Sequence, residues 1–206
     1  MQRARSESDK TARRRRLVAA ALDEFYERGF TAARMEDIAG RADLSKGTLY
    51  LYFSSKEDLF RALIDEYALP NLNTLEMISR TGPSLGAALS AIATFAPQVI
   101  RHSNLPKLLK VLIGDSQNFP GIVRTYREEV IDRGLAAVSA LLQRAHDAGE
   151  IEIDDPALTA RLVIAPMVLS IIWQAVFAHT DKTPIDLDTL FRMHVDHLKR
   201  ALSYQE

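Results

Sequence analysis

The sequence predicts an all-helical protein with an N-terminal three-helix head and a larger C-terminal helical bundle. Three observations predict this fold class. Apolar residues recur at intervals of three and four along most of the chain, which is the spacing of one helix face. The 9 glycines and 8 prolines fall mostly between those periodic segments. The one stretch that alternates like a strand, residues 151–153, is too short to build a sheet.

The periodicity predicts four helices in the N-terminal part, over about residues 9–28, 35–42, 46–52 and 55–69. Gly29 is a natural residue to follow the first helix. Ser45 is expected to cap the third helix, and Ser55 opens the fourth with a sequence similar to a capping box. Pro70 is expected to end the fourth helix.

Six further helices are predicted over about residues 72–80, 84–103, 105–115, 120–148, 156–179 and 187–203. Pro97 and Pro166 fall inside two of them and are expected to kink them. Asp155, followed by a proline, is expected to cap another. The predicted domain boundary gives a head over residues 1–54 and a bundle over residues 55–206.

Composition is that of an ordinary globular protein and excludes several classes. The 206 residues are 47% hydrophobic and 26% charged, which suits one or two domains with a substantial core. Cysteine is absent, which excludes disulfide frameworks, thiol catalysis and cysteine-based zinc sites. No apolar run approaches the ~20 residues of a membrane helix, and the N-terminus lacks the apolar stretch of a secretory signal. We therefore expect a cytoplasmic protein that needs no membrane.

Charge is distributed unevenly along a chain whose formal net charge is only −1. Residues 1–16 contain seven basic and two acidic residues. Such a basic segment suggests contact with a polyanion, and a solvated tail is the alternative. Arg3 and Arg5 fit either an arm in the minor groove of DNA or a disordered end. Because successive helical residues are about 100° apart, the run Arg13 to Arg16 cannot share one face.

The second and third predicted helices, joined by a three-residue break, form a helix-turn-helix pattern. Asp43 lies where the chain is expected to turn through the left-handed region. Gly47 leaves the start of the third helix without a side chain, so a phosphate, a sugar or a thymine methyl group can approach its backbone. Four apolar residues are expected to fill the angle between the two helices: Ile38, Ala39, Leu44 and Leu49.

This pattern resembles the tetracycline-repressor (TetR) family of bacterial transcription regulators. The matching residues lie between Thr11 and about Tyr67, roughly the first third of the chain. The specific part is the string Ser-x-Gly-Thr-Leu-Tyr-x-Tyr-Phe-x-Ser-Lys-Glu over residues 45–57. The resemblance implies a homodimeric repressor that binds a palindromic operator and is released by a hydrophobic small molecule. The alternatives are a DNA-binding dimer without a small effector and an all-helical small-molecule enzyme.

The resemblance implies DNA contacts by eight residues: Arg34, Ser45, Lys46, Gly47, Thr48, Tyr50, Tyr52 and Lys56. Lys46 is the candidate for guanine O6 and N7 in the major groove, with Gly47 and Thr48 beside it. Tyr50 and Tyr52 would donate hydroxyl groups to phosphates. Lys56 would contact a phosphate or, alternatively, is a solvated surface lysine.

Two positions depart from the family pattern. Arg34 stands where the family usually has a serine or threonine cap, and we expect it to reach a phosphate through its charge. Asp43 stands where the family favours glycine. A carboxylate near DNA is unfavourable unless it turns inward to cap a backbone N–H.

Apolar residues form seams with alternating spacings of four and three along the last two helices. The resemblance implies that these helices join their symmetry mates in a four-helix dimer interface, and packing within one chain is the alternative. A dimer also suits a protein that reads two half-sites about 34–36 Å apart. The candidate interface residues are Leu162, Leu169, Ile172, Val176, Phe191, His194 and Leu198.

The resemblance also implies an effector pocket in the bundle. A mostly apolar cavity with few polar groups suits a hydrophobic ligand. Ordinary core packing is the alternative for each candidate, and Trp173 with Gln174 is the favoured pair. The candidates are Phe95, His102, Phe119, Tyr126, Met167, Ile171, Trp173, Gln174 and Phe177.

Catalytic and cofactor motifs are missing from the sequence. It contains no Gly-x-Ser-x-Gly, no P-loop and no dinucleotide-binding glycine fingerprint. His194 and His197 are three residues apart, which permits a metal pair without suggesting one. We therefore expect no catalytic residue, no metal and no cofactor.

Overall fold

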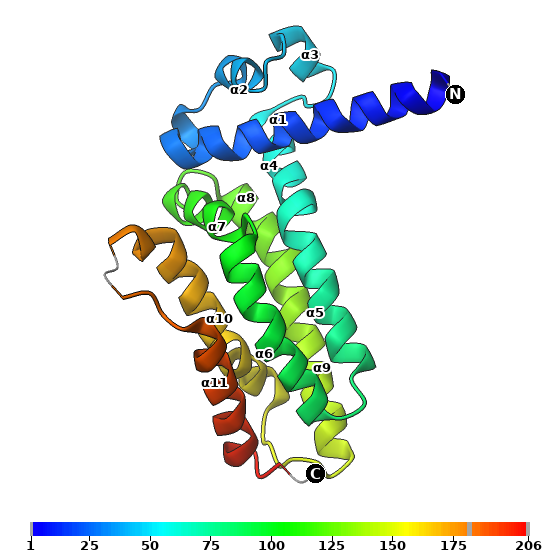
Figure 1. Ribbon diagram of the computed structural model, residues 1–206, viewed down its shortest axis with the longest axis vertical. Coiled ribbons are helices and arrows are strands. Elements are labelled where there is room, and N and C mark those ends of the chain that lie inside the picture. The colour runs from blue at the N-terminus through cyan, green and yellow to red at the C-terminus, as the bar shows by residue number, and fades with distance from the viewer. Residues whose placement is uncertain (1, 181–182, 205–206) are drawn as a thin grey trace. The chain divides into compact units, whose positions relative to one another are not determined.

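The computed structural model describes residues 2–180 and 183–204, and no strand occurs within these ranges. The all-helical class predicted from the sequence is confirmed. Figure 1 shows the helices α1 Gln2–Ala32, α2 Met35–Arg41, α3 Lys46–Tyr50, α4 Lys56–Leu63, α5 Leu69–Thr81, α6 Leu85–His102, α7 Leu105–Gly114, α8 Pro120–Tyr126, α9 Asp132–Asp147, α10 Pro156–Val176 and α11 Leu187–Ala201.

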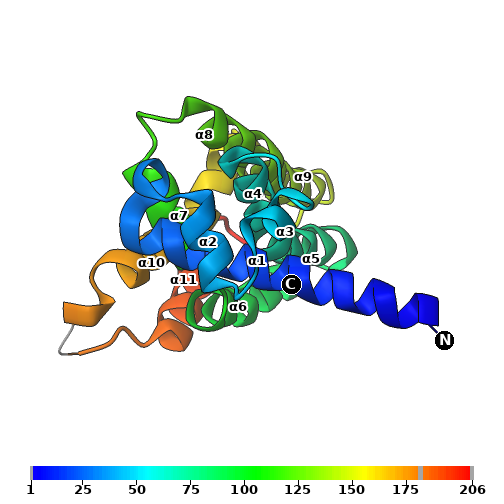
Figure 2. The same ribbon diagram turned by 90° about the horizontal axis from the view of Figure 1, so that it is seen from above.

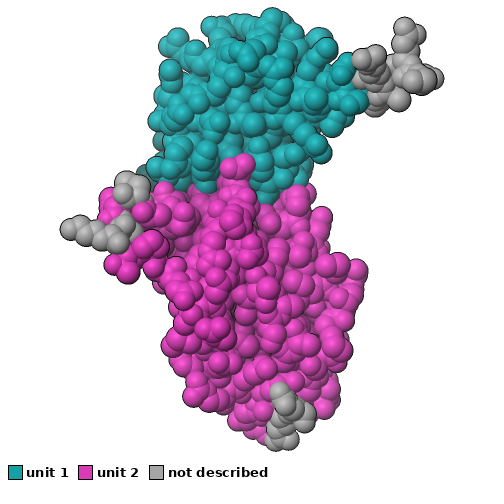
Figure 3. All heavy atoms as spheres, viewed as in Figure 1, with its two compact units in different colours: residues 1–67, 107–125 teal, residues 68–106, 126–206 magenta. Residues whose placement is uncertain are grey.

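The chain divides into two compact units, coloured separately in Figure 3. The first comprises residues 1–67 and 107–125, and the second comprises residues 68–106 and 126–206. This division differs from the predicted boundary after residue 54. The first unit extends past that point because α4 buries Leu59, Phe60 and Leu63, and α4 packs against α1.

Helix α1 contains one break in its helical geometry, at Gly29. Its φ of 79° and ψ of 157° are available to glycine at little cost and unfavourable for other residues. The predicted role of Gly29 at the end of the first long helix is thus confirmed, although a further helical turn follows as far as Ala32. The helix begins at Gln2 and not near residue 9. The side chains of Arg3 and Arg5 lie outside the described residues.

The helix-turn-helix has the predicted caps and core. The Ser45 hydroxyl accepts a hydrogen bond from the Thr48 N–H at 3.0 Å, and Asp43 has a positive φ of 50°. Ile38, Ala39 and Leu49 are buried and Leu44 is half-buried. Figures 1 and 2 show α2 and α3 on one side of α1.

Pro70 does not end the fourth helix. A π-helical turn, Ile64–Ala68, connects α4 to α5, and Pro70 lies in the first turn of α5. The first turn of a helix tolerates proline because its N–H groups have no partner within the helix. A second π-helical turn, Arg127–Ile131, likewise joins α8 to α9 where one long helix was expected.

The second unit is a bundle in which α9 packs against α5 and α10, and α6 packs against α11. Asp155 caps α10 through hydrogen bonds from two backbone N–H groups, as predicted. Helices α6 and α10 continue through Pro97 and Pro166. The shared core of this unit is apolar and includes Leu89, Ile92, Val138, Leu142 and Val163.

Helix α10 is more apolar than the sequence analysis predicted. With 21 residues it is long and apolar enough, by length and composition, to cross a membrane, although only 22% of its most apolar 18-residue stretch is buried. Its buried positions include Ala160, Val163 and Ile171, and α10 packs on α9. The apolar character therefore comes from two faces, of which one is packed and the other is exposed.

Candidate nucleic-acid interface

Helix α3 is anchored on one side and exposed on the other. Leu49 is fully buried and Phe53, just beyond the helix, is 3% exposed. Lys46, Gly47 and Tyr50 are exposed, and Thr48 is half-buried with its hydroxyl hydrogen-bonded to that of Ser45 at 2.8 Å. The fold thus presents a short helix whose polar and small residues lie at the surface, as a groove-reading element requires.

Lys46 is held by an ion pair with Glu36 of α2. The hydrogen bond between them raises the pKa of Lys46 and lowers the pKa of Glu36. The Lys46 ammonium is therefore committed to α2 in the unbound protein. For the predicted contact of Lys46 with a base, the base would have to compete with this exposed carboxylate.

The other predicted DNA-contact residues of the head are accessible to different degrees. Tyr50 is 48% exposed, whereas Tyr52 is half-buried with its ring centroid 6.4 Å from that of Phe53. Arg34 is exposed at the start of α2 and makes no side-chain cap. The contact of its guanidinium with a phosphate stays a prediction.

Lys56 lies in a different environment from the one expected. Its ammonium donates hydrogen bonds to the backbone carbonyls of Phe30 at 2.7 Å and Thr31 at 3.0 Å. It also lies 5.1 Å from the centre of the Phe30 ring. Lys56 therefore satisfies carbonyl groups just after the Gly29 break, and its contact with a phosphate stays a prediction.

Arginines of α1 support the turn of the helix-turn-helix, a role that sequence reasoning missed. The Arg16 guanidinium donates to the carbonyl of Ala42 and pairs with Asp43 at 3.4 Å. Arg14 lies 5.4 Å from the centre of the Phe53 ring. The carboxylate of Asp43 is thus balanced by an arginine and not by a backbone N–H. The aspartate at a position where the family favours glycine was a sequence feature that could have indicated a cationic partner nearby.

A buried carboxylate ties α2 to α1. Glu24 is 2% exposed and pairs with Arg28 at 3.0 Å and Arg41 at 3.1 Å. Arg41 also binds Glu27, and this hydrogen bond is the main cause of the raised pKa of Arg41. These pairs fix the helix that precedes α3, so they orient the surface that α3 presents.

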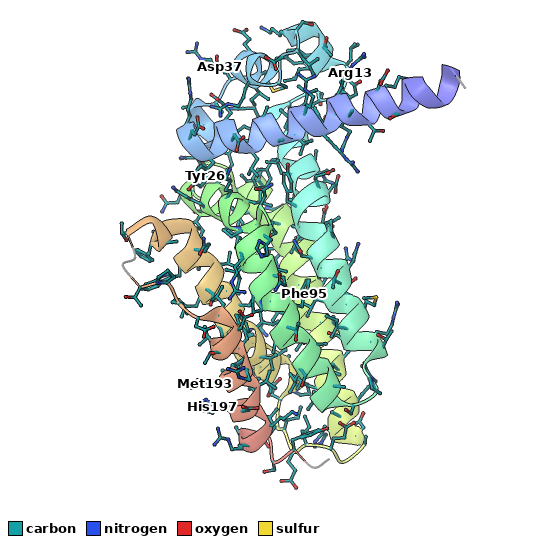
Figure 4. The ribbon with its side chains drawn as sticks, in the orientation of Figure 1. Arg13, Tyr26, Asp37, Phe95, Met193 and His197 are labelled. Carbon is teal, nitrogen blue, oxygen red and sulfur yellow. The ribbon has the colours of Figure 1, made fainter. Side chains whose placement is uncertain are left out.

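Helix α7 contacts the end of α1 within the first unit. Asp115 is 7% exposed and accepts hydrogen bonds from the N–H of Phe30 at 2.7 Å and the hydroxyl of Thr31 at 2.9 Å. Lys110 lies 4.2 Å from the centre of the ring of Tyr26, which Figure 4 labels on α1. These contacts link residues about 85 positions apart, beyond what local sequence patterns predict.

The residues predicted for a dimer interface fall into two groups. Leu162 and Leu169 of α10 are 65% and 64% exposed, and Val176 is 38% exposed. Ile172, His194 and Leu198 are half-buried, and His194 Nε2 lies 3.1 Å from the carbonyl oxygen of Val163.

Phe191 differs from this expectation because it is only 2% exposed within a single chain. Its side chain belongs to the core of the second unit and has no surface to offer a partner. Met193, which sequence reasoning did not select, is 50% exposed on α11 (Figure 4).

The residues predicted for an effector pocket are also divided. Tyr126 and Ile171 are buried, and burial raises the pKa of the Tyr126 hydroxyl above its usual value. His102, Gln174 and Phe177 are exposed, so they do not line an enclosed cavity here. Phe95, Met167 and Trp173 are half-buried.

Phe119 belongs to the first unit and not to the bundle. Its ring packs edge-on against Phe30 with the centroids 4.5 Å apart. Among the described side chains, no group of three or more histidine, aspartate or glutamate residues is placed to hold a metal ion.

Comparison with known proteins identifies both parts of the chain. The model of the bacterial regulatory proteins of the tetR family matches residues 17–63. The model of the AefR-like transcriptional repressor C-terminal domain matches residues 87–195. The first match contains the helix-turn-helix, and the second covers most of the bundle.

Individual relatives resemble the chain over nearly its full length. The HTH-type transcriptional regulator YfiR of Bacillus subtilis (strain 168) is 28% identical over 200 residues, which is 96% of this chain and 95% of that protein. The solved structure of the flavonoid-responsive regulator FrrA is 27% identical with a TM-score of 0.63, covering 93% of this chain and 97% of that one. A putative TetR-family transcriptional regulator from Mesorhizobium loti MAFF303099 has a TM-score of 0.74 at 23% identity, over 93% and 97% of the two chains, and shows the shared fold.

Proposed function

The chain belongs to the TetR family of DNA-binding transcription regulators, and on this premise we propose that it represses transcription as a homodimer on a palindromic operator and is released by a hydrophobic small molecule. The observation that carries the proposal is the exposed face of α3. This helix is capped by Ser45 and anchored by buried Leu49, so its outer residues are presented in a fixed orientation.

The contacts proposed for this surface divide into two classes. Lys46, Gly47 and Thr48 contact base edges, and Lys46 does so after leaving Glu36. Phosphates are contacted by Arg34 and by the hydroxyl groups of the two tyrosines, which position the protein without reading sequence. Lys56 acts mainly by holding the backbone after Gly29.

The exposed apolar face of α10 supports a homodimer. Leu158, Leu162 and Leu169 are each at least 60% exposed in the single chain. An apolar stripe of this kind on a helix favours packing against another helix. We propose that α10 and α11 meet their counterparts in a second copy, which would bring two α3 helices to two half-sites.

The proposed effector site lies in the bundle. Half-buried Phe95, Met167 and Trp173 and the buried hydroxyl of Tyr126 supply apolar surface with one polar group. The solved relative FrrA is described as flavonoid-responsive, which supports an aromatic compound as the effector. A bacterial regulator of this family acts where its DNA is, so the proposed location is the cytoplasm.

Two measurements test the proposal. Selection of duplexes from a random-sequence pool with the full-length protein should enrich a palindrome, and binding to it should be that of a dimer. A thermal-shift screen against apolar aromatic compounds should find ligands that raise the melting temperature and lower operator affinity. Failure to enrich any sequence would contradict the proposed DNA site. Enrichment with no ligand in the screen would favour a regulator without a small effector.

A further inference from the structure

A highly exposed apolar side chain lies at the C-terminal end of α3. Leu51 directly follows α3 and keeps a helical conformation, with φ −72° and ψ −20°. It is 84% exposed, more than any other large hydrophobic residue among the described side chains of the chain. Nothing within the protein covers it, so its exposure has no structural explanation in the single chain.

The geometry of the helix explains the direction of Leu51. Leu49 and Phe53 are the buried residues of this segment, and each is two positions from Leu51. Because each helical residue turns about 100° around the axis and Leu51 keeps the helical conformation, Leu51 lies about 200° from Leu49 and so opposite the buried face. It is therefore at the centre of the outward surface, whereas Lys46 lies closer to the edge and is bound to Glu36.

Gly47 shares this outward surface, four residues before Leu51. A side chain at Gly47 would meet only the Ser45 hydroxyl, at 3.9 Å, and its φ does not lie in the region that favours glycine. Neither packing nor backbone conformation within the chain therefore requires glycine here. The absence of a side chain leaves room for an external body, beside an apolar group that can make contact but cannot hydrogen-bond.

We propose that Leu51 is a specificity-determining residue that contacts the C5-methyl group of a thymine in the major groove of the operator. The methyl group is the apolar feature of that groove, and apolar side chains read it by contact. The inference rests on the proposed function, because it requires that α3 enters the groove.

The test removes in turn the two groups that would make the contact, the thymine methyl group and the Leu51 side chain. An operator is first selected from random duplexes with the wild-type protein, and each thymine is then replaced singly by deoxyuridine, which lacks only the methyl group. Wild-type protein should bind about fourfold more weakly at one thymine in each half-site, the effect of losing one buried methyl group. Leu51→Ala should abolish the difference between thymine and deoxyuridine at that position, and Leu51→Met should restore it.

Controls separate this contact from a general effect. Leu51 is exposed, so Leu51→Ala should fold with an unchanged melting temperature, and its affinity for non-specific duplex should match that of wild type. Met77→Ala, which truncates a 51% exposed residue of α5, should keep the wild-type response to deoxyuridine.

Each outcome decides between alternatives. A thymine–deoxyuridine difference that persists in Leu51→Ala, or equal weakening on every duplex, would overturn the inference and leave the proposed function standing. Equal weakening would identify a contact to the sugar-phosphate backbone. A wild-type protein that selects no sequence would overturn the proposed function and this inference together.

Discussion

In the unbound protein, several charged side chains of the head form ion pairs with one another. Lys46 pairs with Glu36, Arg16 with Asp43, and Arg41 with Glu24. The Lys46–Glu36 pair is exposed, so in the proposed complex a base would compete with the Glu36 carboxylate for the Lys46 ammonium. The sequence identified the cations but not their partners, because Lys46 and Glu36 are ten positions apart on different helices.

We predict that Glu36→Gln strengthens operator binding. The substitution frees Lys46 and removes a negative charge near the DNA. The expected gain is about two- to fivefold at low salt, the range of an exposed ion pair, and it should shrink as salt rises. Fluorescence anisotropy measures it. Glu152→Gln, which removes an exposed charge from the second unit, should leave affinity unchanged, and an equal gain in that control would refute the explanation.

Lys56 should contribute to the stability of the head. Lys56→Ala removes hydrogen bonds to two carbonyl groups, and the free energy of unfolding should fall by about 1–2 kcal/mol. Urea denaturation followed by circular dichroism measures this change. Unchanged stability, together with a salt dependence of DNA binding reduced by about one phosphate contact, would show instead that Lys56 serves only the DNA.

At the scale of elements, sequence patterns predicted what is local. The caps at Ser45 and Asp155 and the break at Gly29 were predicted because each depends on residues within four positions. The continuation of helical structure through Pro70 was not predicted, because it depends on the π-helical turn that precedes Pro70. The contact of Asp115 with the end of α1 was also missed, because it joins segments 85 residues apart.

The contact between α7 and α1 should be energetically important. Asp115→Ala would leave the buried N–H of Phe30 without an acceptor, and unfolding free energy should fall by about 2–3 kcal/mol. Asp115→Asn keeps one acceptor oxygen and should lose less. Thermal and urea denaturation of the two variants give the comparison. The account of this contact fails if both variants are as stable as wild type.

At the scale of the whole molecule, the apolar seams predicted from spacing have one packed face and one exposed face. Spacing alone could not assign Leu162 to the surface and Phe191 to the core, because both repeat at helical intervals. The sequence also could not divide the predicted effector-pocket residues into exposed and buried ones. Exposed His102 and buried Ile171 differ in the packing around them, and neither pattern nor composition contains that information.

The exposed face of α10 should control the oligomeric state. Leu162→Glu combined with Leu169→Glu places two charges on residues that are exposed in the single chain, so each protomer should still fold. The dimer should dissociate to monomers in sedimentation velocity experiments, and operator affinity should fall by at least tenfold. Met77→Glu on α5 is the matched control and should remain dimeric.

The decisive measurement is the sequence selectivity of the full-length protein on random duplex DNA, with its stoichiometry on the selected site. We predict an enriched palindrome whose half-sites lie about one helical turn, or a multiple of it, apart, bound by paired protomers through the outer surface of α3. Binding that is indifferent to sequence, or enrichment that survives replacement of the outward residues of α3, would contradict the account.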